Sequence, residues 1–247
     1  MDSLIKQLSK YITHLIPCRC LICEQNSARL ICTACQAALH KKDSIAIKNS
    51  CVQCGEKLQT NLYHSSIRPK VCGRCISQPP AFDQTFFAYV YQSPIADLIL
   101  RFKYKEQLML SQLLAEKIAL KLLSMPKSSR PTLLIPIPLH PQRLKERGFN
   151  QALELAKHIG KRANIPVYKR HLVRVKQTKT QKQSKRRARA LNMKGAFTLV
   201  QTFDLESQHI AIIDDVITTG STMSEAAKTL RKAQPEQITL LAIAKRH

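Results

Sequence analysis

Cysteine spacing is the feature of this 247-residue chain that most restricts how it can fold. Eight of its nine cysteines form four Cys-x-x-Cys pairs within the first 75 residues. A two-residue gap lets one tight turn present two thiolates to the same ion, and four thiolates suit the tetrahedral geometry of zinc. We therefore expect two sites with four cysteine ligands each: Cys20, Cys23, Cys32 and Cys35 for the first Zn²⁺, and Cys51, Cys54, Cys72 and Cys75 for the second.

The four Cys-x-x-Cys pairs can combine into two zinc sites in more than one way. We favour sequential pairing, and a cross-braced arrangement is the alternative. The residues after Cys32, "TACQAALHKK", predict a short helix that would hold the second pair in its first turn. Sites made only of thiolates leave no coordination position for a catalytic water, so we expect both ions to be structural and to supply folding energy.

The formal net charge of the chain is +24 at pH 7. Such a surface attracts polyanions, namely nucleic acid, nucleotides or anionic membranes, although many basic proteins bind none of them specifically. No run of about 18 apolar residues occurs, so we expect no stable membrane insertion. The first residues lack a clear apolar stretch with a cleavage site, which favours a cytoplasmic protein. They predict an amphipathic helix that packs on its own domain, with its apolar residues between 4 and 16.

Two prolines in "SQPPAFDQ", Pro79 and Pro80, mark a domain boundary. We expect a zinc-binding domain over residues 1–78 and a second domain over 79–247. In the second domain, "TFFAYVYQ" has strand composition, and residues 95–123 read as helices with a break near 104–106. From Pro131 onward apolar strands alternate with helical segments, a pattern that predicts an α/β domain with a mainly parallel sheet.

One strand of this domain runs directly into a polar loop. The apolar run Ile210–Ile213 is expected to end at Asp214 and Asp215, and a helix is expected to start near Ser221. Backbone N–H groups at a helix start favour an anion such as a phosphate, and Gly220 lets the backbone approach closely. The two carboxylates suit sugar hydroxyls or Mg²⁺ instead. A ligand with a ribose and a 5′-phosphate satisfies both parts.

The stretch "IAIIDDVITTGST" resembles the phosphoribosyl-pyrophosphate (PRPP) motif of type I phosphoribosyltransferases. Together with the four cysteine pairs, "IPIPLHPQRLKERGFNQ" and the spaced residues from Thr178 to Phe197, it resembles the competence protein F (ComF/GntX) family over nearly the whole chain. That family joins an N-terminal double zinc ribbon to an amidophosphoribosyltransferase-like domain. The resemblance implies a Rossmann-like type I phosphoribosyltransferase fold in this chain.

The resemblance also implies a PRPP–Mg²⁺ site. Asp214 and Asp215 would be its catalytic carboxylates and would hold the ribose and Mg²⁺, while the loop would hold the 5′-phosphate. The basic loop after the strand near residue 135 would grip the diphosphate, although a solvated loop that leads into a helix cap is the alternative reading. The residues expected to bind PRPP are Asp214, Asp215, Thr218, Thr219, Gly220, Ser221, Thr222, Arg143 and Arg147.

A role in natural transformation is a further implication, with single-stranded DNA and proteins of the DNA-uptake machinery as partners. No carboxylate occurs between Glu154 and Asp204, so the basic residues between them lack acidic neighbours in sequence. This stretch would follow a nucleic-acid backbone, close over the active site as a lid, or remain a solvated loop. The residues expected to bind nucleic acid are Lys179, Lys182, Lys185, Arg186, Arg187 and Arg189.

Stacking platforms for bases are limited, because the chain has no tryptophan. The aromatic residues that would either stack on bases or pack in the core are Phe102, Tyr104, Phe149 and Tyr168. Two other functions remain open. One is an active phosphoribosyltransferase of nucleotide and nucleoside metabolism, although no segment for its acceptor is recognisable. The other is a zinc-ribbon adaptor with a relic PRPP loop.

Overall fold

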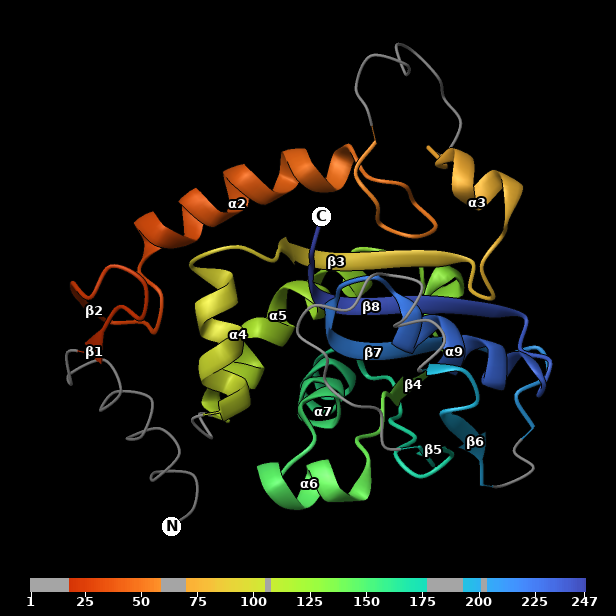
Figure 1. The fold of residues 1–247 in the computed structure, drawn as a ribbon. Coiled ribbons are helices and arrows are strands. Elements are labelled where there is room, and N and C mark those ends of the chain that lie inside the picture. The colour runs from red at the N-terminus through yellow and green to blue at the C-terminus, as the bar shows by residue number, and fades with distance from the viewer. Residues whose placement is uncertain (1–17, 59–69, 105–107, 177–192, 201–203) are drawn as a thin grey trace. The chain divides into compact units, whose positions relative to one another are not determined.

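The computed structural model describes residues 18–58, 70–104, 108–176, 193–200 and 204–247 (Figure 1). The predicted N-terminal amphipathic helix and the basic residues from Lys179 to Arg189 lie outside these ranges. The chain divides into two compact units, residues 1–46 and 47–247. Each unit is described by itself below, and the sequence boundary near residue 78 stays a prediction. In the described part of the chain, no helix is long and apolar enough to span a bilayer.

The smaller unit is built around a cysteine-rich turn. Strands β1 (Cys18–Arg19) and β2 (Asn26–Ser27) form an antiparallel pair. Helix α2 (Thr33–Lys48) follows Cys32 and continues past the end of the unit. Cys35 lies in its first turn as predicted, but the helix is longer than the short helix that the sequence indicated.

The larger unit contains a four-stranded parallel sheet. Its strand order is β3 (Gln84–Val90), β8 (Gln237–Lys245), β7 (His209–Ile217) and β4 (Leu133–Pro136), and every neighbouring pair is parallel. The central strands are buried along nearly their whole length, as parallel strands covered on both faces are. The predicted α/β architecture with a parallel sheet is confirmed.

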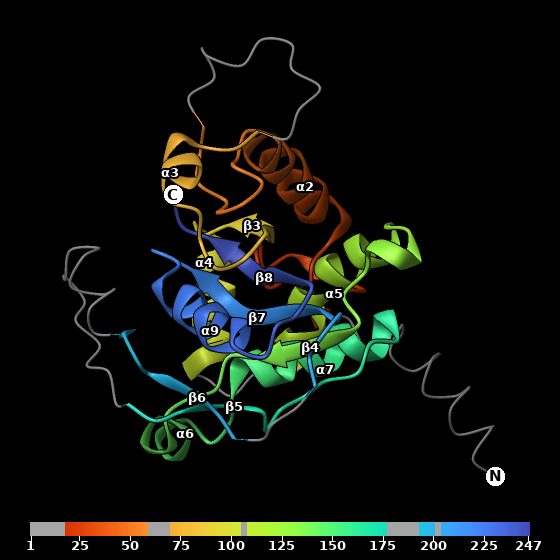
Figure 2. The same ribbon diagram turned by 90° about the vertical axis from the view of Figure 1, so that its right-hand side faces the viewer.

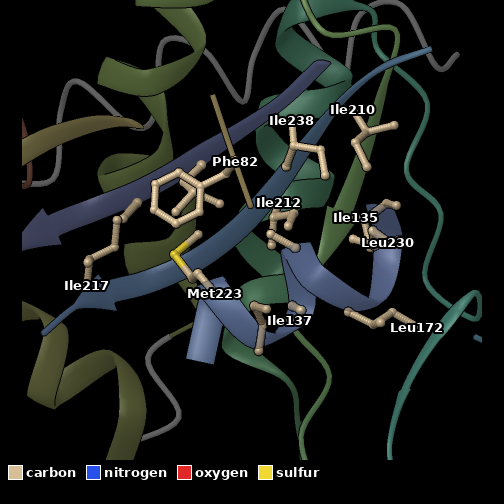
Figure 3. Close-up of a cluster of buried hydrophobic side chains, with 14 of the residues drawn as sticks. Phe82, Ile135, Ile137, Leu172, Ile210, Ile212, Ile217, Met223, Leu230 and Ile238 are labelled. Atoms are coloured by element: carbon tan, nitrogen blue, oxygen red, sulfur yellow. The ribbon is translucent and has the colours of Figure 1, made fainter. Parts of the chain in front are cut away.

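Helices cover both faces of this sheet (Figure 2). Helices α5 (Met109–Leu123) and α7 (Gln151–Ala163) pack together on one face, and α9 (Ser221–Arg231) packs on the other. Beneath α9, Met223 and Leu230 contact a core that includes Ile212, Ile238 and Phe82 (Figure 3). Helix α4 (Ile95–Tyr104) precedes α5, so the predicted break near residue 105 is confirmed.

Short elements connect the main layers. Helix α3 (Gly73–Ser77) follows Cys72, and the 3₁₀ turn η2 (Lys127–Ser129) precedes β4. The region around residues 165–175 contributes β5 (Leu172–Arg174), which pairs antiparallel with β6 (Phe197–Leu199). Before it, a bridge between Leu134 and Val167 extends the edge of the main sheet.

The expected basic loop after β4 contains the short helix α6 (Pro141–Arg147). Its start is explained by Pro141 at the first helical position and by the His140 ring, which accepts a hydrogen bond from the Gln142 N–H at 3.3 Å. Its end is explained by Gly148, whose φ of 77° suits the left-handed turn. Helix α7 then starts directly after Asn150, because the Asn150 side chain accepts from the backbone N–H groups of Ala152 and Leu153.

Candidate functional site

The two adjacent carboxylates lie inside strand β7. The strand was expected to end at Ile213, but it continues to Ile217, because β8 is long enough to pair with Asp214, Val216 and Ile217. The Asp215 N–H donates to Asp214 Oδ1 at 2.8 Å, and the Val216 N–H donates to Asp215 Oδ1 at 2.9 Å. These local hydrogen bonds fix both carboxylates at the carboxyl-terminal part of the strand, where ligands bind in parallel α/β sheets.

Asp215 is buried in an ion pair with α4. It is 6% exposed, and Lys103 Nζ lies 2.5 Å from its Oδ2 atom. Burial by itself lowers the pKa of Lys103, but the charges of Asp215 and Asp214 outweigh burial and raise that pKa. The ammonium group is therefore held charged beside the acid pair. Sequence reasoning did not identify Lys103 as part of this site.

Asp214 has a different electrostatic environment. Burial and the neighbouring charge of Asp215 raise its pKa to about 8, while Lys103 acts in the opposite direction. Arg174 of β5 lies within electrostatic range of Asp214, and Arg143 of α6 lies within range of Arg174: burial lowers the pKa of Arg174, Asp214 raises it, and Arg143 lowers it further. The structure thus gathers two arginines and a carboxylate pair from three separate segments.

The protonation of Asp214 gives a stability prediction. Its carboxyl keeps its proton up to about pH 8 in the folded protein but loses it near pH 3.8 when unfolded. Stability from this group is therefore complete below about pH 4 and is lost as pH rises toward 8. We expect Asp214→Asn to be more stable than the original protein at pH 8, by on the order of a few kcal/mol, with the difference shrinking toward pH 5.

Urea unfolding at pH 5, 6.5 and 8 without added metal would measure this difference. Asp204→Asn is the matched control, since Asp204 is an exposed acid outside the site. Parallel stability profiles for Asp214→Asn and the original protein across this range would contradict the raised pKa of Asp214.

The loop after β7 leads into the start of α9. Gly220 has a φ of 76° and immediately precedes the helix, and the Ser221 N–H at the helix start donates to the Thr219 hydroxyl at 3.4 Å. The hydroxyls of Thr219 and Ser221 lie 2.8 Å apart. Glycine at a left-handed position and an open helix start with nearby hydroxyls suit the binding of a phosphate group. Thr218 is exposed, and Thr222 lies in the first turn of the helix.

A buried lysine donates a hydrogen bond to the backbone of this loop. Lys245 at the end of β8 is 2% exposed, and its Nζ donates to the Thr218 carbonyl at 3.2 Å and to the Arg246 carbonyl at 2.6 Å. Glu56 Oε2 lies 3.7 Å from the same Nζ atom. Because Glu56 follows Cys54 closely in sequence, this ion pair connects the second cysteine group to the loop.

A cavity of about 400 Å³ borders this loop and Lys245. Gly220 and Ser221 line one part of it, and Arg74 and Cys75 line another. The loop and the second cysteine group therefore line the same cavity within the larger unit.

The cysteines form two groups in sequential order. In each group the four Sγ atoms lie within 4.8 Å of one another: Cys20, Cys23, Cys32 and Cys35 in the first, and Cys51, Cys54, Cys72 and Cys75 in the second. Sequential pairing is confirmed, and Cys18 belongs to neither group.

Each group also has backbone N–H donors aimed at sulfur. The Cys32 N–H points to Cys20 Sγ at 3.4 Å, and the Cys72 N–H points to Cys51 Sγ at 3.3 Å. A hydrogen bond from the Cys54 side chain, together with backbone N–H groups, lowers the pKa of Cys51 to about 4. The donor set and its spacing fit Zn²⁺, which binds thiolates.

The arginines predicted to grip a diphosphate lie in one hollow. Arg143 and Arg147 line a space of about 130 Å³ with Lys103, Tyr104 and Glu146. Arg143 Nε is 3.7 Å from Glu146 Oε2, and the Arg147 guanidinium lies 5.3 Å from the centre of the Tyr104 ring. Arg143 is therefore paired with Glu146, whereas Arg147 is engaged with an aromatic ring.

The fold and this site together define a class of protein. Residues 145–247 match the family model described as "Phosphoribosyl transferase domain". With its parallel sheet, the larger unit has the type I phosphoribosyltransferase fold, and the two cysteine groups are consistent with zinc ribbons.

Comparison with individual proteins gives the family. Competence protein F of Haemophilus influenzae is 32% identical over 234 residues, which cover 92% of this chain and 96% of that protein. DNA utilization protein YhgH of Escherichia coli K12 is 29% identical over 203 residues, covering 81% and 83%. This chain belongs to the competence protein F family. A purine phosphoribosyltransferase from Pyrococcus horikoshii superposes with a TM-score of 0.36 at 18% identity, covering 54% of this chain and 74% of that structure.

Proposed function

We propose that this protein binds PRPP with Mg²⁺ and single-stranded DNA, and that it acts in the cytoplasm in DNA uptake during natural transformation. The observation that carries the proposal is the buried carboxylate pair followed by an open, hydroxyl-lined helix start, in a chain whose relatives are named for competence and DNA utilization. Proteins of the uptake machinery are its expected partners.

The PRPP site is assigned by charge. The loop from Thr218 to Thr222 suits the 5′-phosphate, because helix N–H groups and hydroxyls donate to its oxygens. Asp214 and Asp215 suit the ribose hydroxyls and Mg²⁺, which takes oxygen ligands. Arg143 and Arg174 are positioned to bind a diphosphate through charge-assisted hydrogen bonds. When bound, Mg²⁺ would neutralise diphosphate charge.

Zinc is proposed for both cysteine groups. The two groups offer four thiolates each, and the N–H donors described above stabilise the negative charge of thiolates. Metal binding would contribute directly to the folding of these turns, since each holds few apolar side chains of its own.

A second candidate function is turnover. The acid pair would stabilise the positive charge that develops at the anomeric carbon of ribose, and the two arginines would stabilise the negative charge of the departing pyrophosphate. The observation that favours it is the Lys103–Asp215 ion pair, which keeps Asp215 in a defined orientation at the site. The acceptor that would replace pyrophosphate is not identified by the residues around the loop.

Isothermal titration of the zinc-loaded chain with PRPP and Mg²⁺ tests the proposal. We expect a Kd on the order of micromolar, and a loss of at least about 100-fold in the Asp214→Asn/Asp215→Asn double variant. Asp204→Asn is the control for a surface carboxylate. Micromolar binding that survives the double variant would contradict the assigned site, and no binding by the original protein would favour an adaptor with a relic loop.

The same titration with a short single-stranded oligonucleotide tests the second ligand. We expect DNA affinity to fall when Lys179, Lys182, Lys185, Arg186, Arg187 and Arg189 are replaced by glutamine, while PRPP affinity stays. DNA affinity that depends on the acid pair as strongly as PRPP affinity does would contradict two separate surfaces.

A further inference from the structure

An exposed aromatic ring marks the hollow beside the acid pair. Tyr104 is the last residue of α4, and it is 68% exposed. The Arg147 guanidinium lies 5.3 Å from the ring centre, a distance typical of a cation–π pair.

The other aromatic candidates from the sequence pack against neighbouring rings, and Phe149 and Tyr168 are half-buried. Phe102 is fully buried and contacts Phe149, with ring centres 5.7 Å apart. Tyr168 packs against His171 and the core beneath α9. Of the four aromatic residues that were open to either interpretation, Tyr104 presents its ring to solvent.

The surroundings of Tyr104 are cationic. Lys103, Arg143 and Arg147 line the same hollow, and Glu146 is the carboxylate among them. Glu146 already interacts with Arg143 at 3.7 Å. An aromatic ring with neighbouring cations is the combination that single-stranded nucleic-acid sites use, because bases stack on the ring while cations neutralise phosphates.

The position of the hollow connects it to the proposed PRPP site. Lys103 lines the hollow and reaches Asp215 Oδ2 at 2.5 Å, and the next residue along α4 is Tyr104. A base held on Tyr104 is therefore one side chain away from the carboxylate pair. The hollow itself, at about 130 Å³, is small, so it suits one flat ring stacked at its edge.

We propose that Tyr104 and Arg147 form a stacking platform for one unpaired nucleobase at the edge of this cationic hollow. This inference rests on the proposed function, since it identifies where a strand or an acceptor meets the site. The shared chemistry is an unpaired base, and its source is either a single-stranded DNA or a free nucleotide. The flat guanidinium of Arg147 extends the stacking surface beyond the ring.

A tryptophan substitution provides the test. The chain contains no tryptophan, so Tyr104→Trp introduces a single indole on the platform. We expect its fluorescence to be quenched by a 12-nucleotide oligothymidylate but not by an abasic 12-mer with the same phosphates. Thymidine monophosphate in a parallel titration distinguishes the source: quenching by the oligonucleotide at much lower concentration identifies a strand, and equal potency identifies a free nucleotide.

Affinity measurements provide the second readout, by fluorescence anisotropy of the same labelled oligonucleotides. We expect Tyr104→Ala to lose about fivefold or more in affinity for the base-containing strand, with little change for the abasic one. Tyr104→Phe should keep the preference for bases. Lys117→Gln is the matched control, because Lys117 Nζ forms a separate cation–π pair with Tyr89 at 4.3 Å.

The outcomes separate the inference from the proposed function. If the original protein binds the oligonucleotide and the abasic strand equally, or if Tyr104→Ala binds the base-containing strand normally, the platform is wrong while DNA binding stands. If no oligonucleotide binds and thymidine monophosphate quenches the indole, DNA binding is wrong while the platform stands. If nothing binds, both are wrong.

Discussion

Replacing Cys51 with serine should destabilise the whole larger unit by at least about 4 kcal/mol and should weaken the proposed PRPP binding, because it would remove one ligand of the proposed second zinc site. Cys51, Cys54 and Cys75 are buried in the same hydrophobic cluster as Phe82 and Phe87. This cysteine group is therefore part of the core that supports the sheet, and its loss exposes apolar side chains of the sheet itself.

Hydrogen bonds also link the turn of the second cysteine group to the sheet. The Thr85 hydroxyl of β3 donates to the Gln53 carbonyl at 2.6 Å, and the Thr85 N–H donates to the Val52 carbonyl at 2.9 Å. Lys245, which forms an ion pair with Glu56, also donates a hydrogen bond to the Thr218 carbonyl. A change in the structure of the turn that holds Cys51 should therefore also change the edge strand β3 and the loop from Thr218 to Thr222.

Cys20→Ser is the matched control. Cys20 and Cys51 are each 1% exposed, and each is the first cysteine of its group. We expect both variants to lose one of two zinc ions by mass spectrometry. Hydrogen exchange over residues 84–90 and 209–231 should rise only in Cys51→Ser. Equal protection of these strands in the two variants would contradict a supporting role for the second group.

The sequence was most informative where one pattern recurs. Four Cys-x-x-Cys pairs predicted both cysteine groups, and the apolar strands with helices between them predicted the parallel sheet. The helix cap at Asn150 and the turn at Gly148 were also readable, since side-chain capping and positive φ depend on neighbouring residues. Local chemistry determines these features.

The residues that sequence reasoning missed depend on contacts between distant segments. Lys103 and Asp215 are 112 positions apart in the sequence. The fold brings α4 and β7 close enough for their two side chains to form an ion pair. A signal existed, because Lys103 lies four residues after the buried Ile99 and so continues the apolar face of its helix. Arg174 likewise shares a strand face with the buried Leu172, and Lys245 directly follows the apolar run 240–244 of its strand.

The extent of β7 was misjudged for a related reason. Paired acids normally indicate the end of a buried strand, and the prediction placed the end there. The strand continues because β8 offers paired backbone groups as far as Lys245, and because each aspartate accepts the next N–H in the chain. Pairing with a neighbouring strand is a tertiary property that residue composition does not contain.

Replacing Lys103 with methionine should destabilise the protein by about 3–5 kcal/mol at pH 7.5, because it leaves Asp215 buried without its cation. Asp215 is 6% exposed and lies next to a second carboxylate, so solvent cannot readily replace the ammonium group. Lys103→Arg, which keeps the charge, should be far less damaging. Adding Asp215→Asn to Lys103→Met should recover much of the loss, since no unpaired charge then remains.

Lys157→Met is the control for removing a lysine from a surface pair. Lys157 Nζ is 2.7 Å from Glu154 Oε1, but this lysine is about half exposed, so its loss should change stability by less than about 1 kcal/mol. Urea unfolding of all variants at pH 7.5 and pH 4 gives the comparison. The penalty for Lys103→Met should shrink at pH 4, where a proton can neutralise the unpaired carboxylate. A penalty no larger than that of Lys157→Met at both pH values would mean that the acid pair tolerates its burial without the lysine, and that the ion pair does not organise the site.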